Sequence, residues 1–374
     1  MRFPEFSGEW EIYPLTDFMS FKNGMNPDAK RFGRGTKFIS VMDILNNQFI
    51  CYDNIRASVE VVDGDIETYG VNYGDILFQR SSETLEDVGQ ANVYLDSKPA
   101  VFGGFVIRGK SKSNYYPMFF RYLLASPTAR KKIIVKGAGA QHFNIGQDGL
   151  SKVCLNIPSI QEQEKIAKLF ECIDTRIATQ NKIIEDLKKL KSAIYQELFS
   201  NLQGEKKSLS ELAEITKGQQ VNGNQLNENG KYYVMNGGIM PSGYYDDYNT
   251  EAGTISISEG GNSCGYVQYN KSKFWSGGHC YTLHIKPTAR ISTLFLFHFL
   301  KWKEEDIMRL RIGSGLPNIQ KKDLSKVRII VPTFDKQQRL IALLSTLQMK
   351  IEYEEMYTIN LDKQKLHLLS QMFI

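Results

Sequence analysis

The sequence lacks the motifs that mark a self-contained enzyme. It contains no GxxxxGK[ST] loop for a nucleoside triphosphate, no GxGxxG after an expected strand, no nucleophile elbow and no HExxH helix. A nuclease or methyltransferase acting alone would need metal-binding carboxylates or a cofactor loop, and neither is found. We therefore predict no catalytic residue in this chain.

Cysteine is scarce as well. The five cysteines are odd in number and have no CxxC spacing, which argues against both a disulfide framework and a structural zinc site. His279, Cys280 and His284 stand close to Cys264 and leave a metal cluster open as an alternative. Their spacing differs from that of structural zinc sites, so we predict packing or a ligand contact there and no bound metal.

Long apolar runs are also missing. No stretch of about 18 apolar residues is free of charge, and the residues from Met1 to Glu5 do not begin a signal peptide. We expect no membrane segment and a cytoplasmic protein.

What the chain does contain is an internal repeat. Residues 144–200 align without a gap with residues 318–374, and 14 of the 57 pairs are identical. The matches include Asn144 with Asn318 and Gln163 with Gln337. A period of this length is too long for a solenoid unit and fits a duplicated domain. We predict globular domains over residues 1–158 and 201–332, each followed by a helical spacer, at 159–200 and 333–374.

Charge is distributed unevenly. The net charge of +5 lies on the two globular domains, because basic and acidic residues balance in both spacers. Local basic clusters, such as residues 130–136 and 301–311, suit contacts with phosphates, and a solvated surface is the alternative for each.

The spacers have the pattern of a coiled coil. Residues 161–200 lack proline and glycine, and apolar residues recur at heptad positions a and d in both copies. The linker at 201–206 is short, so the second domain lies at the end of the first helix and the second helix returns antiparallel. Two surface helices packed on separate domains are the alternative.

The sequence predicts the α+β class for the globular domains. Short segments rich in β-branched and aromatic residues are bounded by Gly, Asn, Asp and Ser, and each domain ends with helical stretches. A glycine-rich turn follows at 137–144 and again at 313–318. The loops at 80–84 and 258–263 follow matched strands but differ in sequence, which suits two similar modules that recognise different ligands.

These residues resemble the specificity subunit of type I restriction-modification enzymes. The resemblance covers the whole chain and is most specific at residues 150–166 and 324–332, where a strand ends in proline before a long helix. The opening, residues 2–10, also resembles the family, whereas Lys336 departs from the usual Glu-Gln pair. The resemblance implies two target recognition domains related by a pseudo-twofold repeat, each reading half of a split, asymmetric DNA sequence across a gap that the helices set.

The resemblance also implies a division of labour in host defence and DNA methylation. It implies that this subunit is non-catalytic and prokaryotic and that it binds double-stranded DNA. Two modification subunits would carry S-adenosylmethionine, and restriction subunits would use ATP and Mg²⁺. The predicted docking positions for the modification subunits are apolar residues of both helices: Ile166, Leu169, Ile173, Leu187, Leu340, Leu343, Leu347 and Leu361.

The predicted DNA contacts lie in the loops, the turns and one basic cluster. Arg80 suits a guanine edge, with burial in a salt bridge as its alternative, and a purely structural role is the alternative for Asn144 and Asn318. The positions are Arg80, Ser81, Ser82, Lys131, Lys132, Lys136, Gln141, His142, Asn144, Ser258, Asn262, Ser263, His279, Arg311, Ser314 and Asn318. A coiled-coil adaptor that binds proteins at both ends remains the other rival to a DNA reader.

Overall fold

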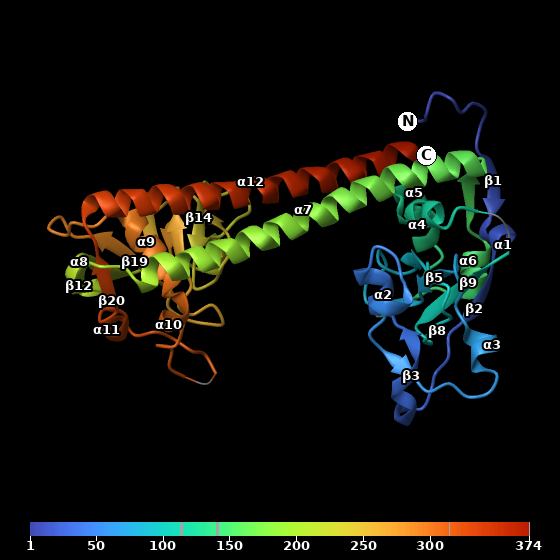
Figure 1. Ribbon diagram of the computed structural model, residues 1–374, viewed down its shortest axis with the longest axis horizontal. Coiled ribbons are helices and arrows are strands. Elements are labelled where there is room, and N and C mark those ends of the chain that lie inside the picture. Colours follow the sequence, from blue (N-terminus) through green and yellow to red (C-terminus); the bar gives the residue numbers. More distant parts are fainter. Residues whose placement is uncertain (113–114, 140–141, 314, 374) are drawn as a thin grey trace. The chain divides into compact units, whose positions relative to one another are not determined.

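The computed structural model describes residues 1–112, 115–139, 142–313 and 315–373. It divides into two compact units (Figure 1). Unit 1 comprises Met1–Asn181 and Met356–Ile374, and unit 2 comprises Lys182–Glu355. Both long helices, α7 (Ile160–Ser200) and α12 (Phe334–Met372), contribute to each unit. No helix in the described ranges combines the length and the apolar character needed to cross a membrane.

Unit 1 is built on an antiparallel sheet with the strand order β2-β9-β5-β7. Two further sheets have the orders β4-β3-β8 and β1-β11, and β6 pairs with β10. The strands are β1 (Glu11–Pro14), β2 (Met19–Asn23), β3 (Phe32–Ile39), β4 (Ser58–Val59), β5 (Ile76–Gln79), β6 (Ser81–Ser82), β7 (Ala91–Val93), β8 (Val101–Phe102), β9 (Val106–Ser111), β10 (Phe143–Asn144) and β11 (Cys154–Ile157). The helices are α1 (Leu15–Phe18), η1 (Ala29–Arg31), α2 (Val41–Asn46), η2 (Tyr52–Asn54), α3 (Asp65–Tyr69), α4 (Pro117–Ala125), α5 (Pro127–Ile134) and α6 (Gln147–Ser151).

Unit 2 repeats this topology. Its sheets have the orders β13-β19-β16-β17, β15-β14-β18 and β12-β20. The strands are β12 (Glu205–Ser208), β13 (Ala213–Lys217), β14 (Tyr232–Met235), β15 (Tyr244–Tyr245), β16 (Thr254–Ser258), β17 (Val267–Asn270), β18 (Trp275–Ser276), β19 (Cys280–Ile285) and β20 (Arg328–Val331). The helices are α8 (Leu209–Leu212), η3 (Gly223–Gln225), α9 (Thr293–Trp302), α10 (Glu304–Met308) and α11 (Lys321–Leu324).

The order of strands shows that the sequence repeat is a repeat of whole domains. In both units a four-stranded antiparallel sheet stands beside a three-stranded sheet with one parallel pair, β3 with β8 and β14 with β18. A pair formed by the first and last strands, β1 with β11 and β12 with β20, closes each domain before its long helix. The predicted α+β class with an internal repeat is confirmed.

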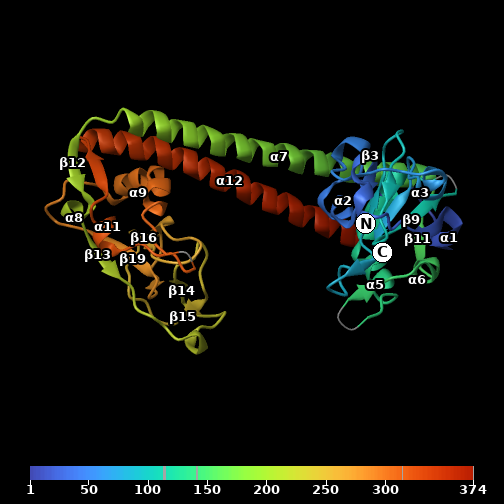
Figure 2. The same ribbon diagram turned by 90° about the horizontal axis from the view of Figure 1, so that it is seen from below.

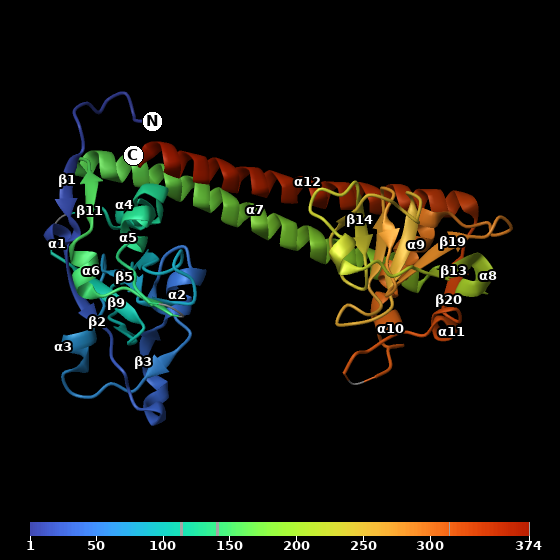
Figure 3. The ribbon, with the colours of Figure 1, turned by 180° about the vertical axis from the view of Figure 1, so that it is seen from behind.

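Apolar packing follows from the sequence of the central strands. All residues of β5 and β16 are buried, as expected for strands covered on both faces. In unit 1, α4 and α5 pack together beside the beginning of α7 (Figure 3). There the ring of Tyr122 lies against that of Phe170. In unit 2, α9 packs on β16 and β17 (Figure 2). Its Phe299 contacts Phe199 of α7.

The long helices pair antiparallel within each unit. In unit 1, Phe170 stacks on Phe373, Asp174 pairs with Lys365 at 2.5 Å, and the Arg176 Nε donates to the Tyr357 hydroxyl at 2.9 Å. In unit 2, Lys188 pairs with Glu355 at 2.6 Å, and Lys191 donates to Gln348 at 2.6 Å. Residue numbers rise along α7 while those of its contacts fall along α12, so the predicted antiparallel pair is confirmed.

A buried glutamine fixes the start of each long helix. Gln163 is 3% exposed, donates to the Pro158 carbonyl and accepts from the Tyr116 amide. Its repeat partner Gln337 is fully buried and makes the equivalent bonds with Pro332 and Ser292. The identity of these two residues in the repeat therefore has a structural cause.

Candidate nucleic-acid interface

In unit 1 the predicted loop and the glycine-rich turn come together. The chain leaves β5 through Arg80 and enters β6, which pairs antiparallel with β10. Ser81 lies opposite Asn144, and Ser82 lies opposite Phe143. Two segments far apart in the sequence thus form one polar site at the end of β5.

Arg80 is half-buried at this site. Its Nη1 donates to the Gly104 carbonyl at 3.2 Å. Within the described ranges no carboxylate forms an ion pair with Arg80, which removes the salt-bridge alternative there. Its remaining guanidinium N–H groups make a base contact possible, and that contact stays a prediction.

The turn of unit 1 is held by its own polar side chains. The Ser81 hydroxyl donates to the Asn144 side-chain oxygen, and the Asn144 amide donates to the His142 carbonyl at 3.3 Å. Asn144 therefore has the structural role considered as its alternative. Both His142 and Asn144 remain exposed. The predicted contacts at Gln141 and Ser314 lie outside the described residues.

Unit 2 brings the equivalent segments together with less regular pairing. Asn318 forms bridges with Gly260 and with Ile312, and the Gly261 amide donates to the Pro317 carbonyl at 3.0 Å. The predicted contacts around this site differ in exposure: Asn262, Arg311 and Asn318 are exposed, and Ser263 is half-buried.

Ser258 corrects one sequence-based expectation. Its side chain is buried, and the hydroxyl donates to the Gly237 carbonyl at 2.7 Å and lies 3.2 Å from the Gly260 carbonyl. A buried hydroxyl with both bonds inside the domain holds the loop and has no free edge for DNA. Ser258 is therefore structural, because it still belongs to the buried strand β16.

Backbone hydrogen bonds define which residues correspond in the two units. The Arg80 amide donates to the Phe105 carbonyl at 2.8 Å, and the Arg80 carbonyl accepts from Ile145. In unit 2 the Glu259 amide donates to the His279 carbonyl at 2.9 Å, and the Glu259 carbonyl accepts from Ile319. Arg80 thus corresponds to Glu259, and Phe105 corresponds to His279. The same backbone positions carry different chemistry.

Glu259 differs from Arg80 because its side chain is turned inward. The carboxylate pairs with Lys217 at 2.7 Å and accepts from the Tyr281 hydroxyl at 3.0 Å. Burial, with the hydrogen bond to Glu259, raises the pKa of Tyr281 to about 12. His279 Nδ1 lies 3.7 Å from Glu259 Oε2, and the His279 side chain is 64% exposed. His279 is thus the outward polar group at this point.

The basic cluster of α5 divides into free and bound side chains. Lys131 and Lys136 are exposed. Lys132 donates to the Cys154 carbonyl at 3.0 Å, and Arg130 turns inward to the Glu86 and Val88 carbonyls. Lys131 and Lys136 are therefore the members best placed to meet a phosphate.

The alternative of a metal cluster in unit 2 depends on Cys264 and Cys280. Cys264 is fully buried and donates to the Glu259 carbonyl. Burial raises the pKa of the Cys280 thiol to about 11, which disfavours the thiolate that a metal requires. In the described part of the chain no three His, Cys, Asp or Glu side chains are grouped as metal ligands.

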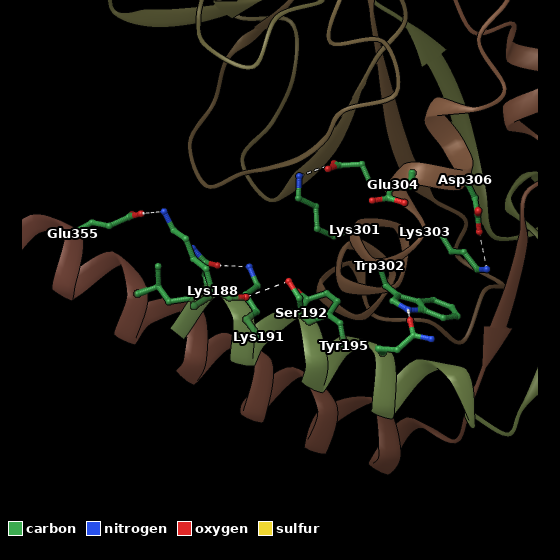
Figure 4. A pocket seen from close by; sticks show the side chains of 14 residues that line it. Lys188, Lys191, Ser192, Tyr195, Lys301, Trp302, Lys303, Glu304, Asp306 and Glu355 are labelled. Atoms are coloured by element: carbon green, nitrogen blue, oxygen red, sulfur yellow. Dashed lines mark hydrogen bonds and ion pairs between the residues drawn. The ribbon is translucent and has the colours of Figure 1, made fainter. Parts of the chain in front are cut away.

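A pocket of about 770 Å³ opens in unit 2 between α7, α9, α10 and α12 (Figure 4). Three of its four lysines are paired with carboxylates: Lys188 with Glu355, Lys301 with Glu304 at 2.5 Å, and Lys303 with Asp306 at 2.8 Å. The fourth, Lys191, donates to Gln348. The lining has as many carboxylates as lysines and thus no excess positive charge that would hold a phosphate, so we do not assign Lys301 and Lys303 to DNA.

The predicted docking positions are buried or half-buried, with one exception. Ile166, Leu340 and Leu361 are buried, which corrects their assignment to a free surface. The half-buried residues are Leu169, Ile173, Leu187 and Leu347, whereas Leu343 is 49% exposed. Heptad periodicity also placed Ile183 and Leu190 of α7 in the seam between the helices, but they are 41% and 50% exposed, which corrects that assignment. It did not single out the outer apolar residues of α12, which are Met349, Tyr353, Met356, Ile359 and Leu366.

Phe105, whose carbonyl accepts from the Arg80 amide, was not singled out by the sequence analysis. The tripeptides Gly103-Gly104-Phe105 and Gly277-Gly278-His279 stand as far apart in the sequence as Asn144 and Asn318. This shared glycine pair is the sequence feature that could have pointed to Phe105 and to its correspondence with His279.

Two domains of one topology, each with a polar loop at the same sheet edge, define a duplicated α+β protein. The model of the family described as type I restriction modification DNA specificity domain matches residues 7–189 and 202–361. The chain belongs to this family.

Curated relatives agree with this assignment. A putative type I specificity subunit of Mycoplasma pneumoniae is 35% identical over 157 residues, which cover 42% of each protein. Its counterpart from Mycoplasma genitalium is 32% identical over 39% of this chain and 38% of the relative. The chain thus spans about two fifths of these relatives in the matched regions. A putative type I restriction enzyme specificity subunit of Methanocaldococcus jannaschii is 24% identical over 96% of this chain and 92% of the relative.

The fold is shared with solved structures. The crystal structure of a type I restriction-modification S subunit from M. genitalium superposes with a TM-score of 0.62 at 18% identity, covering 100% of this chain and 99% of that one. The predicted family and architecture are confirmed.

Proposed function

We propose that this chain reads a bipartite DNA sequence for a type I restriction-modification complex, with one half read by each unit. The observation that carries the proposal is the correspondence of Arg80 with Glu259 and of Phe105 with His279. The two units have the same backbone hydrogen bonds but different side chains at these positions, which suits two different halves of an asymmetric target. The helices α7 and α12 set the gap between the halves.

The outer apolar residues of the helices support docking of two modification subunits. In unit 1, Met356, Ile359 and Leu366 are each more than half exposed, and their spacing of three and seven residues places them on one helix face. In unit 2, Met349 and Tyr353 are similarly exposed one turn apart. Such apolar groups suit a protein partner better than solvent.

Catalysis belongs to the partners in this proposal. The modification subunits bind S-adenosylmethionine and methylate the site, and restriction subunits consume ATP with Mg²⁺. The chain supplies recognition and assembly and remains non-catalytic.

A domain exchange tests the proposal. The segment from Leu209 to Pro332 is replaced by that of a related subunit, the complex is expressed with its modification subunits, and methylated sites in the genome are mapped. One half of the methylated sequence should change while the other half and the gap persist. A change in both halves would contradict the two-reader scheme.

Two controls separate the rival functions. Capture of partner proteins without any DNA affinity of the complex would favour a coiled-coil adaptor. Binding of S-adenosylmethionine by the isolated chain in a calorimetric titration would favour an enzyme.

A further inference from the structure

Each unit contains a Gly-Gly-X turn, at Gly103-Gly104-Phe105 in unit 1 and Gly277-Gly278-His279 in unit 2. The turns join the third strand of one sheet to the neighbouring sheet, β8 to β9 and β18 to β19. Both end beside the residue that follows the buried central strand, because the Arg80 and Glu259 amides donate to the carbonyls of Phe105 and His279.

The same backbone bonds hold the two turns. In unit 1 the Gly24 amide donates to the Val106 carbonyl at 3.1 Å, and the Gly103 amide donates to Ile39 at 3.0 Å. In unit 2 the Gly218 amide donates to the Cys280 carbonyl, and the Gly277 amide donates to Met235, both at 2.8 Å. The turn therefore has one geometry that does not depend on its side chains.

Close packing disfavours a side chain at both glycines of each turn. A Cβ on Gly103 would lie 2.7 Å from the Phe38 ring, and one on Gly104 would lie 2.0 Å from Asn26 Oδ1. A Cβ on Gly277 would lie 2.7 Å from Asn236 Oδ1, and one on Gly278 would lie 2.7 Å from Gln220 Oε1. The third residue is thus the first in the turn that can carry a side chain outward. Phe105 is 70% exposed, and the His279 side chain is 64% exposed.

A single exposed phenylalanine is ordinary on a protein surface and indicates nothing by itself. Phe105 differs because its place is duplicated, rigid and adjacent to the loop site of each unit. The frame is retained in both copies, while the outward group changes from an apolar ring to an imidazole. A residue that selects a base needs a backbone held in one position and a side chain that can differ between the two domains, and the Gly-Gly-X turn provides both.

We propose that the third residue of each Gly-Gly-X turn contacts a base edge and determines the preferred base at one position of its half-site. In unit 1 the ring of Phe105 packs against the methyl group of a thymine, a contact available in the major groove. In unit 2 the imidazole of His279 hydrogen-bonds a base edge. This inference rests on the proposed function, because it assigns a base contact within that DNA site.

The test uses the complex of the chain with its modification subunits and duplexes that carry its methylation sequence. Each thymine of the unit 1 half-site is replaced in turn by deoxyuridine, which removes only the methyl group. For the unaltered protein, one replacement should weaken binding about fourfold, as expected for one buried methyl group. The Phe105→Ala protein should bind the thymine and deoxyuridine duplexes equally at that position.

A second experiment exchanges the side chains of residues 105 and 279. Phe105→His should change the methylated sequence at one position of the unit 1 half-site only, and His279→Phe should do so in the other half only. Tyr73→Ala is the matched control, since Tyr73 is 62% exposed and precedes β5 at the end opposite Arg80. It should alter neither methyl discrimination nor the methylated sequence.

The outcomes separate this inference from the proposed function. If Phe105→Ala retains the methyl discrimination of the parent, or if no thymine replacement weakens binding, the assignment of Phe105 is overturned while sequence-specific binding stands. If the parent complex binds all duplexes alike, the proposed function fails. Thermal unfolding of each variant verifies that it is folded.

Discussion

The hydroxyl of Ser81 donates a hydrogen bond to the side-chain oxygen of Asn144. This bond joins the loop after β5 to the glycine-rich turn, two segments that sequence reasoning treated as separate candidates for DNA contact. In unit 2 the backbone bridge between Gly260 and Asn318 makes the same connection. Both copies of the repeat thus share the contact between this loop and the glycine-rich turn as well as the fold.

Arg80 should carry base selectivity in unit 1. We expect Arg80→Ala to lose about 1–3 kcal/mol of discrimination at one position of the unit 1 half-site, the range found for a bidentate base contact. Binding of the complex to duplexes altered one base pair at a time measures this. Ser258→Ala is the control: removal of a buried hydrogen bond should lower the free energy of unfolding by about 1–3 kcal/mol and leave the base preference unchanged.

Lys131 and Lys136 should contribute through phosphates. We expect Lys131→Ala combined with Lys136→Ala to weaken binding to all sequences alike and to reduce the log–log salt slope by roughly 0.9 for each lost contact. Titrations of the complex at several salt concentrations give the slope. Lys152→Ala, which removes a lysine paired with Asp148 at 2.7 Å, should change it less. An unchanged slope in the double variant would identify these lysines as a solvated surface.

His298 should make unit 2 sensitive to acid. Burial, with the charge of Lys191, lowers the pKa of His298 from 6.5 to about 4, and the Tyr195 hydroxyl bonds its Nδ1 at 2.6 Å. Between pH 6.5 and 4 the unfolded chain binds a proton at this residue that the folded chain does not. The free energy of unfolding should therefore decrease as the pH is lowered from 6.5 to 4.

Urea unfolding at pH 7 and pH 5 measures the effect. His298→Gln should remove this part of the pH dependence and lower stability at pH 7. His367→Gln, at an exposed histidine of α12, is the control and should retain the full dependence. An identical pH profile for His298→Gln and the parent would contradict the expectation.

The outer face of α12 should bind a modification subunit. We expect Met349→Ser with Tyr353→Ser to weaken that association about tenfold or more, the effect of losing interface residues worth at least 1 kcal/mol, without lowering the free energy of unfolding. Co-purification and titration with the modification subunit test it. Leu340→Ala should show the opposite pattern, with a loss of stability of about 2–5 kcal/mol, because Leu340 is buried. Equal association of the double variant and the parent would assign this face no docking role.

The amino-acid sequence by itself determined the repeat, the α+β class and the antiparallel helices. These follow from local patterns: identities at fixed spacing, the alternation of β-branched residues with turn residues, and an apolar period that only a helix can bury. Gln163 and Gln337 illustrate this, since matched residues make matched hydrogen bonds.

The tertiary structure decided which residues share a site and which face outward. Ser258 was placed on a loop by its neighbours in sequence, but the last residue of β16 is still buried. Ile166 and Leu361 fit a helical seam, yet a period cannot tell whether that seam meets the protein's own core or a partner. Phe105 and Arg80 lie 25 residues apart in the sequence and meet through one backbone hydrogen bond. Strand register sets such contacts, and register depends on packing across the whole sheet.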